Sequence, residues 1–135
     1  MRTILSVDDD PKVLAAFETA LKQKGYEVFI TTDPEEVARI LTDHEINLVM
    51  LDIRMPQKNG FEIFQELKKR YEKLPVLFVT AYPKSFTMHS DEMIDLWKNE
   101  FADGNTDIMY KPFTLDLLYE KVEGLIGSAT GDEGE

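Results

Sequence analysis

The chain has 135 residues, 43% of them hydrophobic and 30% charged, a size and composition that suit one globular domain with its own core. Its formal net charge of −11 argues against nucleic acid as a direct partner, because a phosphate backbone binds basic surfaces. The lack of cysteine excludes disulfides, thiolate catalysis and zinc–thiolate sites. No apolar run is long enough to span a membrane, and acidic residues begin at Asp8, too early for a secretory signal. We therefore expect a cytoplasmic protein with no membrane partner.

Strand and helix signals alternate from the N-terminus. Residues 3–7 form an apolar run that predicts a first strand. Asp10 and Pro11 then predict the start of a helix, because aspartate is a good N-cap and proline suits the first helical position. Gly25 is expected to end this helix. Residues 26–30, rich in aromatic and β-branched side chains, predict a second strand.

The middle of the chain repeats this pattern and adds an acid. Asp33 and Pro34 predict a second helix start, and Glu36 stands three residues after the cap, where a capping box places its acid. Residues 47–51 predict a third strand, because the apolar run at 48–51 is typical of a strand buried on both faces. Asp52 follows at the carboxyl end of that strand, the edge at which open α/β sheets bind ligands.

The second half of the chain completes five strand–helix pairs. The expected elements are a helix after Gly60, a strand over residues 75–79, a helix within 81–106, a strand over 107–110 and a helix between Thr114 and Gly127. Strands that alternate with helices predict right-handed crossovers and a three-layer α/β fold, with a parallel sheet covered on both faces. We expect residues 1–127 to form one domain and the acidic residues 128–135 to form a flexible tail.

Charged residues follow three of the predicted strands. Asp8, Asp9 and Asp10 follow the first strand, Asp52 the third and Lys111 the fifth. Because the carboxyl ends of parallel strands meet at one edge of a sheet, we expect a single site there. A buried carboxylate is unfavourable without a partner, so the acids and the lysine are expected to pair. Asp10 is an exception, since its position before a proline favours an N-cap over a further ligand.

Four motifs, in order and each at a predicted strand end, resemble those of response-regulator receiver domains, the phosphoacceptor modules of two-component signalling. The motifs are Val7-Asp8-Asp9, Leu51-Asp52-Ile53-Arg54-Met55-Pro56 with Gly60, Thr80-Ala81, and Lys111-Pro112-Phe113. Each motif is weak alone, but the ordered set is highly specific, and the resemblance covers roughly residues 3–126. It implies the flavodoxin-like fold of the chemotaxis regulators, with strand order 2-1-3-4-5.

The resemblance implies a phosphoacceptor and a magnesium site. Asp52 would accept a phosphoryl group from a phosphohistidine donor, forming an aspartyl phosphate. Clustered carboxylates repel one another unless a cation intervenes, and Mg²⁺ prefers oxygen ligands. The implied Mg²⁺ ligands are Asp9, Asp52 and the backbone carbonyl of Arg54, with Asp8 acting directly or through a water molecule.

The resemblance also implies a switch and its partners. Lys111 would pair with the phosphoryl oxygens, and Thr80 would donate its hydroxyl to them. The small Ala81 would leave room for the phosphoryl group, and the peptide bond between Lys111 and Pro112 is expected to be cis. The face formed by the fourth helix, fifth strand and fifth helix would switch between two states. The implied partners are a sensor histidine kinase or histidine phosphotransfer protein and a downstream protein effector.

Two features depart from the family pattern. Ile108 stands where the family has an aromatic residue, and the segment between Thr80 and Lys111 is longer than the family norm. We therefore hypothesise an altered output surface on an intact phosphorylation site. The chain would be a stand-alone regulator, a phosphorelay intermediate or a domain of a longer protein.

Three other functions compete with that of a phosphorylated receiver. A degenerate receiver that binds partners without phosphorylation stays open, because Ile108 replaces the aromatic residue. An aspartyl-phosphate phosphatase is disfavoured, because Arg54 occupies the position of its second acid. A flavodoxin is disfavoured, because the acids from Asp8 onward would repel a cofactor phosphate. The receiver would be consumed as the substrate of its own phosphoryl transfer, so we expect a switch and not an enzyme.

Overall fold

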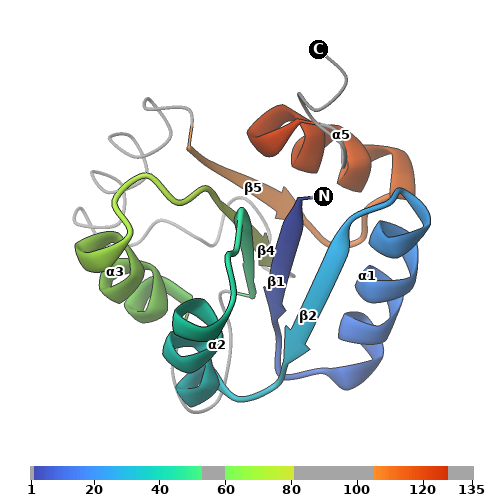
Figure 1. Cartoon of the computed structure of the whole chain (residues 1–135). Helices are drawn as coiled ribbons and strands as arrows, with labels where there is room; N and C mark the ends of the chain where they lie inside the picture. The colour runs from blue at the N-terminus through green and yellow to red at the C-terminus, as the bar shows by residue number, and fades with distance from the viewer. Residues whose placement is uncertain (1, 53–59, 81–104, 128–135) are drawn as a thin grey trace, which may run out of the picture.

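The computed structural model describes residues 2–52, 60–80 and 105–127 (Figure 1). It contains a five-stranded sheet in the order β2-β1-β3-β4-β5, and every neighbouring pair of strands is parallel. This confirms the predicted α/β fold and strand order. The strands are β1 (Thr3–Val7), β2 (Glu27–Thr31), β3 (Leu48–Asp52), β4 (Val76–Thr80) and β5 (Thr106–Tyr110). The helices are α1 (Pro11–Gln23), the 3₁₀ turn η1 (Pro34–Glu36), α2 (Val37–Asp43), α3 (Gly60–Arg70) and α5 (Leu115–Ile126).

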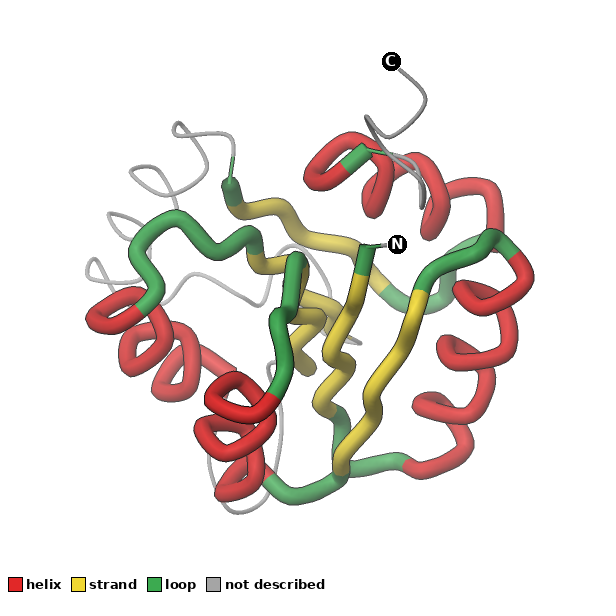
Figure 2. Tube along the Cα trace, in the orientation of Figure 1, coloured by secondary structure: helices red, strands yellow, loops and turns green. Residues whose placement is uncertain are grey.

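Helices cover both faces of the sheet, with α1 and α5 on one side and α2 and α3 on the other (Figure 2). The strands divide their side chains between these two layers, because successive residues of a strand point to opposite faces. On β1, Ile4 packs in the cluster beneath α1 and α5, whereas Leu5 packs in the cluster beneath α2 and α3. All five residues of β1 and of β3 are buried, as a parallel sheet covered on both sides requires.

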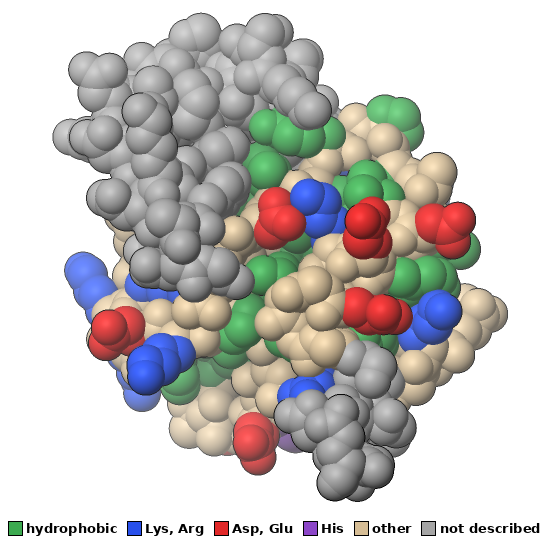
Figure 3. Space-filling view, turned by 90° about the horizontal axis from the view of Figure 1, so that it is seen from above, with side chains coloured by type: hydrophobic (Ala, Val, Ile, Leu, Met, Phe, Trp, Pro, Cys, Tyr) green, Lys and Arg blue, Asp and Glu red, His purple; other side chains and the backbone are tan. Residues whose placement is uncertain are grey.

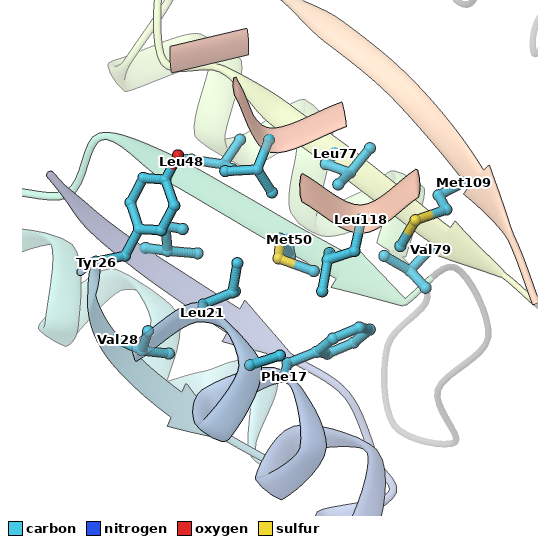
Figure 4. Packing of buried hydrophobic residues seen from close by; sticks show 13 residues of the cluster. Phe17, Leu21, Tyr26, Val28, Leu48, Met50, Leu77, Val79, Met109 and Leu118 are labelled. Carbon is cyan, nitrogen blue, oxygen red and sulfur yellow. The ribbon is translucent and has the colours of Figure 1, made fainter. Parts of the chain in front are cut away.

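The core beneath α1 and α5 contains side chains from all five strands, packed against side chains of the two helices. Figure 4 shows part of this packing. Phe17 and Leu21 project from α1 toward the sheet, and Leu118 projects from α5. These side chains meet Met50 of β3 and Met109 of β5, each 1% exposed. The two helices are therefore packed against one face of the sheet along the length of its strands.

Helix caps follow the sequence signals with one exception. Asp10 caps α1 by accepting the Lys12 N–H at 2.9 Å, and Thr114 caps α5 by accepting the Leu117 N–H at 3.1 Å. Gly25, with φ of 95°, follows the C-cap of α1 as predicted.

The capping box at the second helix start is absent. The Asp33 N–H donates to the Thr31 hydroxyl at 3.0 Å and not to Glu36. The Glu36 carboxylate instead accepts the Thr31 hydroxyl at 2.6 Å and pairs with Arg39 at 2.8 Å. The chain begins this helical segment with the 3₁₀ turn η1 before α2 starts at Val37. The Glu36 carboxylate therefore links the end of β2 to α2 by accepting hydrogen bonds from Thr31 and Arg39.

Three predicted strands begin one residue late in the structure. Tyr26 lies between α1 and β2, and its N–H donates to the Leu21 carbonyl of α1 at 3.2 Å. Asn47 precedes β3, but it extends the pairing to β1: its N–H donates to the Thr3 carbonyl and its side chain accepts the Thr3 N–H, both at 2.8 Å. Pro75 precedes β4, since proline has no N–H to donate to a ladder. The helix expected within residues 81–106 and the tail at 128–135 lie outside the described residues.

Charges of both signs are scattered over the face opposite the predicted site (Figure 3). Lys121 of α5 pairs with Asp107 of β5 at 3.0 Å, so basic side chains there lie beside acidic ones. Among the described residues, none of the helices is both long and apolar enough to cross a membrane.

Candidate functional site

Asp8 lies directly after β1 and is 1% exposed. Its backbone N–H donates to the Thr31 carbonyl at 3.3 Å, which continues the pairing of β1 with β2. Its carboxylate Oδ1 accepts the Asp10 N–H at 2.9 Å. The end of β2 thus holds the backbone of Asp8, and the N-cap residue of α1 holds its side chain.

Asp8, Asp9 and Asp52 form a carboxylate cluster, with one oxygen from each lying within 4.8 Å of the others. The parallel pairing of β1 with β3, which sets Val7 opposite Leu51, brings the two strand ends together. Asp52 is the last residue of β3 and is 6% exposed, whereas Asp9 is exposed to solvent. The cluster therefore has two buried acids at its base and one acid at its mouth.

Lys111, which follows β5, reaches the same cluster. Its Nζ lies 3.3 Å from Asp8 Oδ2, and its side chain is 23% exposed. Burial raises the pKa of the Asp8 carboxyl above its ordinary value, while the Asp10 N–H and the Lys111 ammonium act in the opposite direction. The ammonium offsets part of the cost of burying this acid next to two others. The expected cis peptide bond between Lys111 and Pro112 is confirmed.

The remaining predicted residues are placed only in part. Thr80 is the last residue of β4 and pairs with Tyr110 of β5, so its backbone lies at the same edge of the sheet. Arg54 and Ala81 lie outside the described residues. Ile108 pairs with Phe78 and packs against the core beneath α2 and α3. The position where the family has an aromatic residue is thus filled by a partly buried aliphatic side chain.

Two neighbours of the cluster were not predicted from the sequence. Thr31 holds the Asp8 backbone, although the only sequence signal was its place directly after the second predicted strand. Phe113 stacks on Phe17 of α1, with ring centroids 5.5 Å apart, and so ties the loop after Lys111 to the adjacent helix. Its place in the Lys-Pro-Phe motif was visible, but its contact depends on packing between distant segments.

The donor set of the cluster fits a small, hard divalent cation. Its three side chains offer only carboxylate oxygens, which Mg²⁺ and similar ions prefer. Mg²⁺ commonly keeps several water ligands, and the exposed Asp9 lies on the side where water can reach. A cation held by Asp8, Asp9 and Asp52 would also neutralise the repulsion among them.

Comparison with known proteins assigns the chain to a family. The family described as response regulator receiver domain matches residues 4–123. The chain is 32% identical over 123 residues to response regulator RR06 of Streptococcus pneumoniae and 30% identical over 123 residues to transcriptional regulatory protein CrdR of Helicobacter pylori. These alignments cover 91% and 90% of this chain but 52% and 54% of the two relatives, so the chain spans about half their length.

Solved structures agree with the family match. The chemotaxis protein CheY4 of Vibrio cholerae is 25% identical with a TM-score of 0.77, covering 93% of this chain and 98% of that one. The response regulator TrrA of Thermotoga maritima, in complex with Mg²⁺ and BeF, is 28% identical with a TM-score of 0.72, covering 93% and 99%. Since the family match spans most of the chain and the sheet order agrees, this chain belongs to the response regulator receiver domains of two-component systems.

Proposed function

We propose that Asp52 accepts a phosphoryl group from a phosphohistidine donor in a Mg²⁺-dependent transfer. The observation that carries this proposal is the convergence on one sheet edge of Asp52, the other two acids of the cluster, and Lys111. An Asp52 carboxylate oxygen would form the new bond to phosphorus as the phosphorus–nitrogen bond to the donor imidazole breaks. The imidazole leaves with the electron pair of that bond and takes up a proton. The product is an aspartyl phosphate.

The other residues of the site would stabilise the negative charge on the phosphoryl group during this reaction. Bound Mg²⁺ would neutralise negative charge on the transferring phosphoryl oxygens. Asp8, Asp9 and Asp52 would supply its side-chain ligands, and the Arg54 backbone carbonyl is a further proposed ligand. Lys111, now 3.3 Å from Asp8, would pair with a phosphoryl oxygen, and Thr80 would donate its hydroxyl to another.

Phosphorylation would then act as a switch. A new dianionic group at the strand ends would shift the equilibrium of the segment between β4 and α5, changing the surface offered to a protein effector. A sensor histidine kinase or histidine phosphotransfer protein would be the donor, and we place both in the cytoplasm with this chain. Because each chain is consumed as substrate, we propose a signalling switch and not an enzyme.

An intact mass spectrum after incubation with acetyl phosphate and Mg²⁺ tests the proposal. We expect one added phosphoryl group on the native chain, none on Asp52→Asn and none in the presence of a chelator. The Asp10→Asn variant is the matched control, because Asp10 caps α1 and its side chain is not part of the cluster. It should be labelled like the native chain. A native chain that stays unmodified under all conditions, or an Asp52→Asn variant that is still labelled, would refute the proposal.

A further inference from the structure

Thr31 connects the carboxylate cluster to the corner between β2 and α2. It is the last residue of β2 and is 5% exposed. Its carbonyl accepts the Asp8 N–H at 3.3 Å, which is long for an N–H···O hydrogen bond. A bond of this length weakens quickly when either partner is displaced. The position of the Asp8 backbone therefore depends in part on how firmly Thr31 is held, while the Asp10 N–H and Lys111 hold the Asp8 side chain.

The Thr31 hydroxyl makes hydrogen bonds within that corner with Glu36, with the Asp33 N–H and, at 3.3 Å, with the Asp33 carbonyl. The hydroxyl donates to Glu36 Oε1 at 2.6 Å and accepts the Asp33 N–H at 3.0 Å. The second carboxylate oxygen of Glu36 accepts from Arg39 Nη2 at 2.8 Å, which orients the acid. The bond from the Thr31 hydroxyl is also the main reason why the pKa of Glu36 lies below its ordinary value. A short bond to a charged acceptor is strong enough to fix the corner.

We infer that Thr31 and Glu36 are positioning residues for Asp8, and that they set the Mg²⁺ affinity of the cluster without touching the cation. Glu36 fixes the Thr31 hydroxyl, and the Thr31 carbonyl fixes the Asp8 backbone. The inference rests on the proposed role of Asp8 as a Mg²⁺ ligand. Residues that orient metal ligands from behind commonly change metal affinity by about tenfold or more when they are replaced.

Isothermal titration of Mg²⁺ into the full chain and its variants tests the inference. Thr31→Val keeps the shape of the side chain but removes the hydroxyl, and we expect about tenfold weaker Mg²⁺ binding. Thr31→Ser keeps the hydroxyl and should restore most of the native affinity. Thr42→Val is the matched control, because the Thr42 hydroxyl donates at 2.9 Å to the Ala38 carbonyl within α2 and makes no bond toward Asp8. Its affinity should equal that of the native chain.

Further readouts separate positioning from a general loss of structure. In the metal-free chain, Thr31→Val should shift the backbone amide resonances of Asp8 and Asp10, whereas Thr42→Val should not. Glu36→Ala, on a side chain only half-buried, tests the same link if Thr31→Val fails to fold, and it too should weaken Mg²⁺ binding.

The outcomes distinguish the inference from the proposed function. A native chain that binds no Mg²⁺ would overturn both. Native binding that Thr31→Val and Glu36→Ala leave unchanged would overturn the positioning role alone, as would equal weakening by Thr42→Val.

Discussion

Replacing Tyr26 by phenylalanine should lower the free energy of unfolding at neutral pH. In strong alkali the variant should instead be more stable than the native chain. Tyr26 lies just before β2 and is 3% exposed. Its hydroxyl donates to the Gly127 carbonyl, at the C-terminus of α5, at 2.7 Å. This bond joins residues 101 positions apart and ties α5 to the edge of the sheet opposite the carboxylate cluster. Its loss leaves the Gly127 carbonyl without this donor, at a cost of about 1 to 1.5 kcal/mol.

The alkaline behaviour follows from the raised pKa of Tyr26. Burial, reinforced by the Glu123 carboxylate, raises the pKa of Tyr26 from 10 to about 12, against a smaller lowering by Arg2. The folded chain thus holds the phenolic proton more tightly than the unfolded chain does. The resulting stabilisation is complete below pH 10 and is lost as the pH rises toward 12. Two pKa units correspond to about 2 to 3 kcal/mol, more than the hydrogen bond contributes, so Tyr26→Phe becomes the more stable chain at the alkaline end.

Urea unfolding of the native and Tyr26→Phe chains at a series of pH values measures both effects. The difference between the two chains isolates Tyr26 from other groups that titrate in alkali. Tyr119→Phe, which removes a 3.1 Å hydrogen bond to the Ala20 carbonyl, controls for loss of a tyrosine hydroxyl at neutral pH. Equal stability of native and Tyr26→Phe chains at neutral pH, or a difference that does not change between pH 9 and 12, would refute the reasoning. The labelling by acetyl phosphate that we propose for Asp52 should be the same in the native and Tyr26→Phe chains at neutral pH.

Three further predictions concern the cation, the core and an acid. Mg²⁺ at a hundred times its dissociation constant should raise the free energy of unfolding by about 2.7 kcal/mol, seen in urea titrations and reversed by a chelator, and Asp9→Asn should reduce the gain. Leu118→Ala, at a fully buried position, should cost about 3 kcal/mol with an unchanged urea m-value; a loss below 1 kcal/mol would contradict the packing. The pKa of Glu36 is lowered chiefly by the Thr31 hydroxyl, so its stabilisation is present above the ordinary carboxyl pKa and is lost as the pH falls through the lowered value. The free energy of unfolding should therefore fall more steeply at acidic pH in the native chain than in Glu36→Gln. Curves that coincide would contradict a stabilising role for the Glu36 carboxylate.

The alternation of strands and helices was predictable because local signals agree with the global fold. Apolar runs marked each strand, and aspartate followed by proline marked two helix starts. Errors of one residue arose where backbone groups serve two elements, as at Tyr26 and Asn47. The capping box failed for a different reason. Glu36 accepts a hydrogen bond from the Thr31 hydroxyl and not from the Asp33 N–H, and this contact depends on how the end of β2 is placed next to η1.

The site was predictable as a convergence of residues but not as a set of contacts. A parallel sheet brings its carboxyl strand ends to one edge, so Asp8, Asp52 and Lys111 had to approach one another. The sequence held no information that Lys111 would pair with Asp8 rather than with Asp52. It also did not predict that Thr31 holds Asp8 from behind, because that bond joins residues whose proximity arises only from strand pairing.

The two consecutive acids after β1 differ in their contact with solvent, and this difference has a practical consequence. Asp8 is anchored by the Asp10 N–H and Lys111, whereas Asp9 stands at the surface. Replacing Asp8 would remove the carboxylate that pairs with Lys111 at 3.3 Å, so a change at this position disturbs more contacts than a change at Asp9. Because Asp9 is exposed, replacing it disturbs less of the fold. Substitutions at Asp9 should therefore change the proposed cation binding while leaving the fold intact.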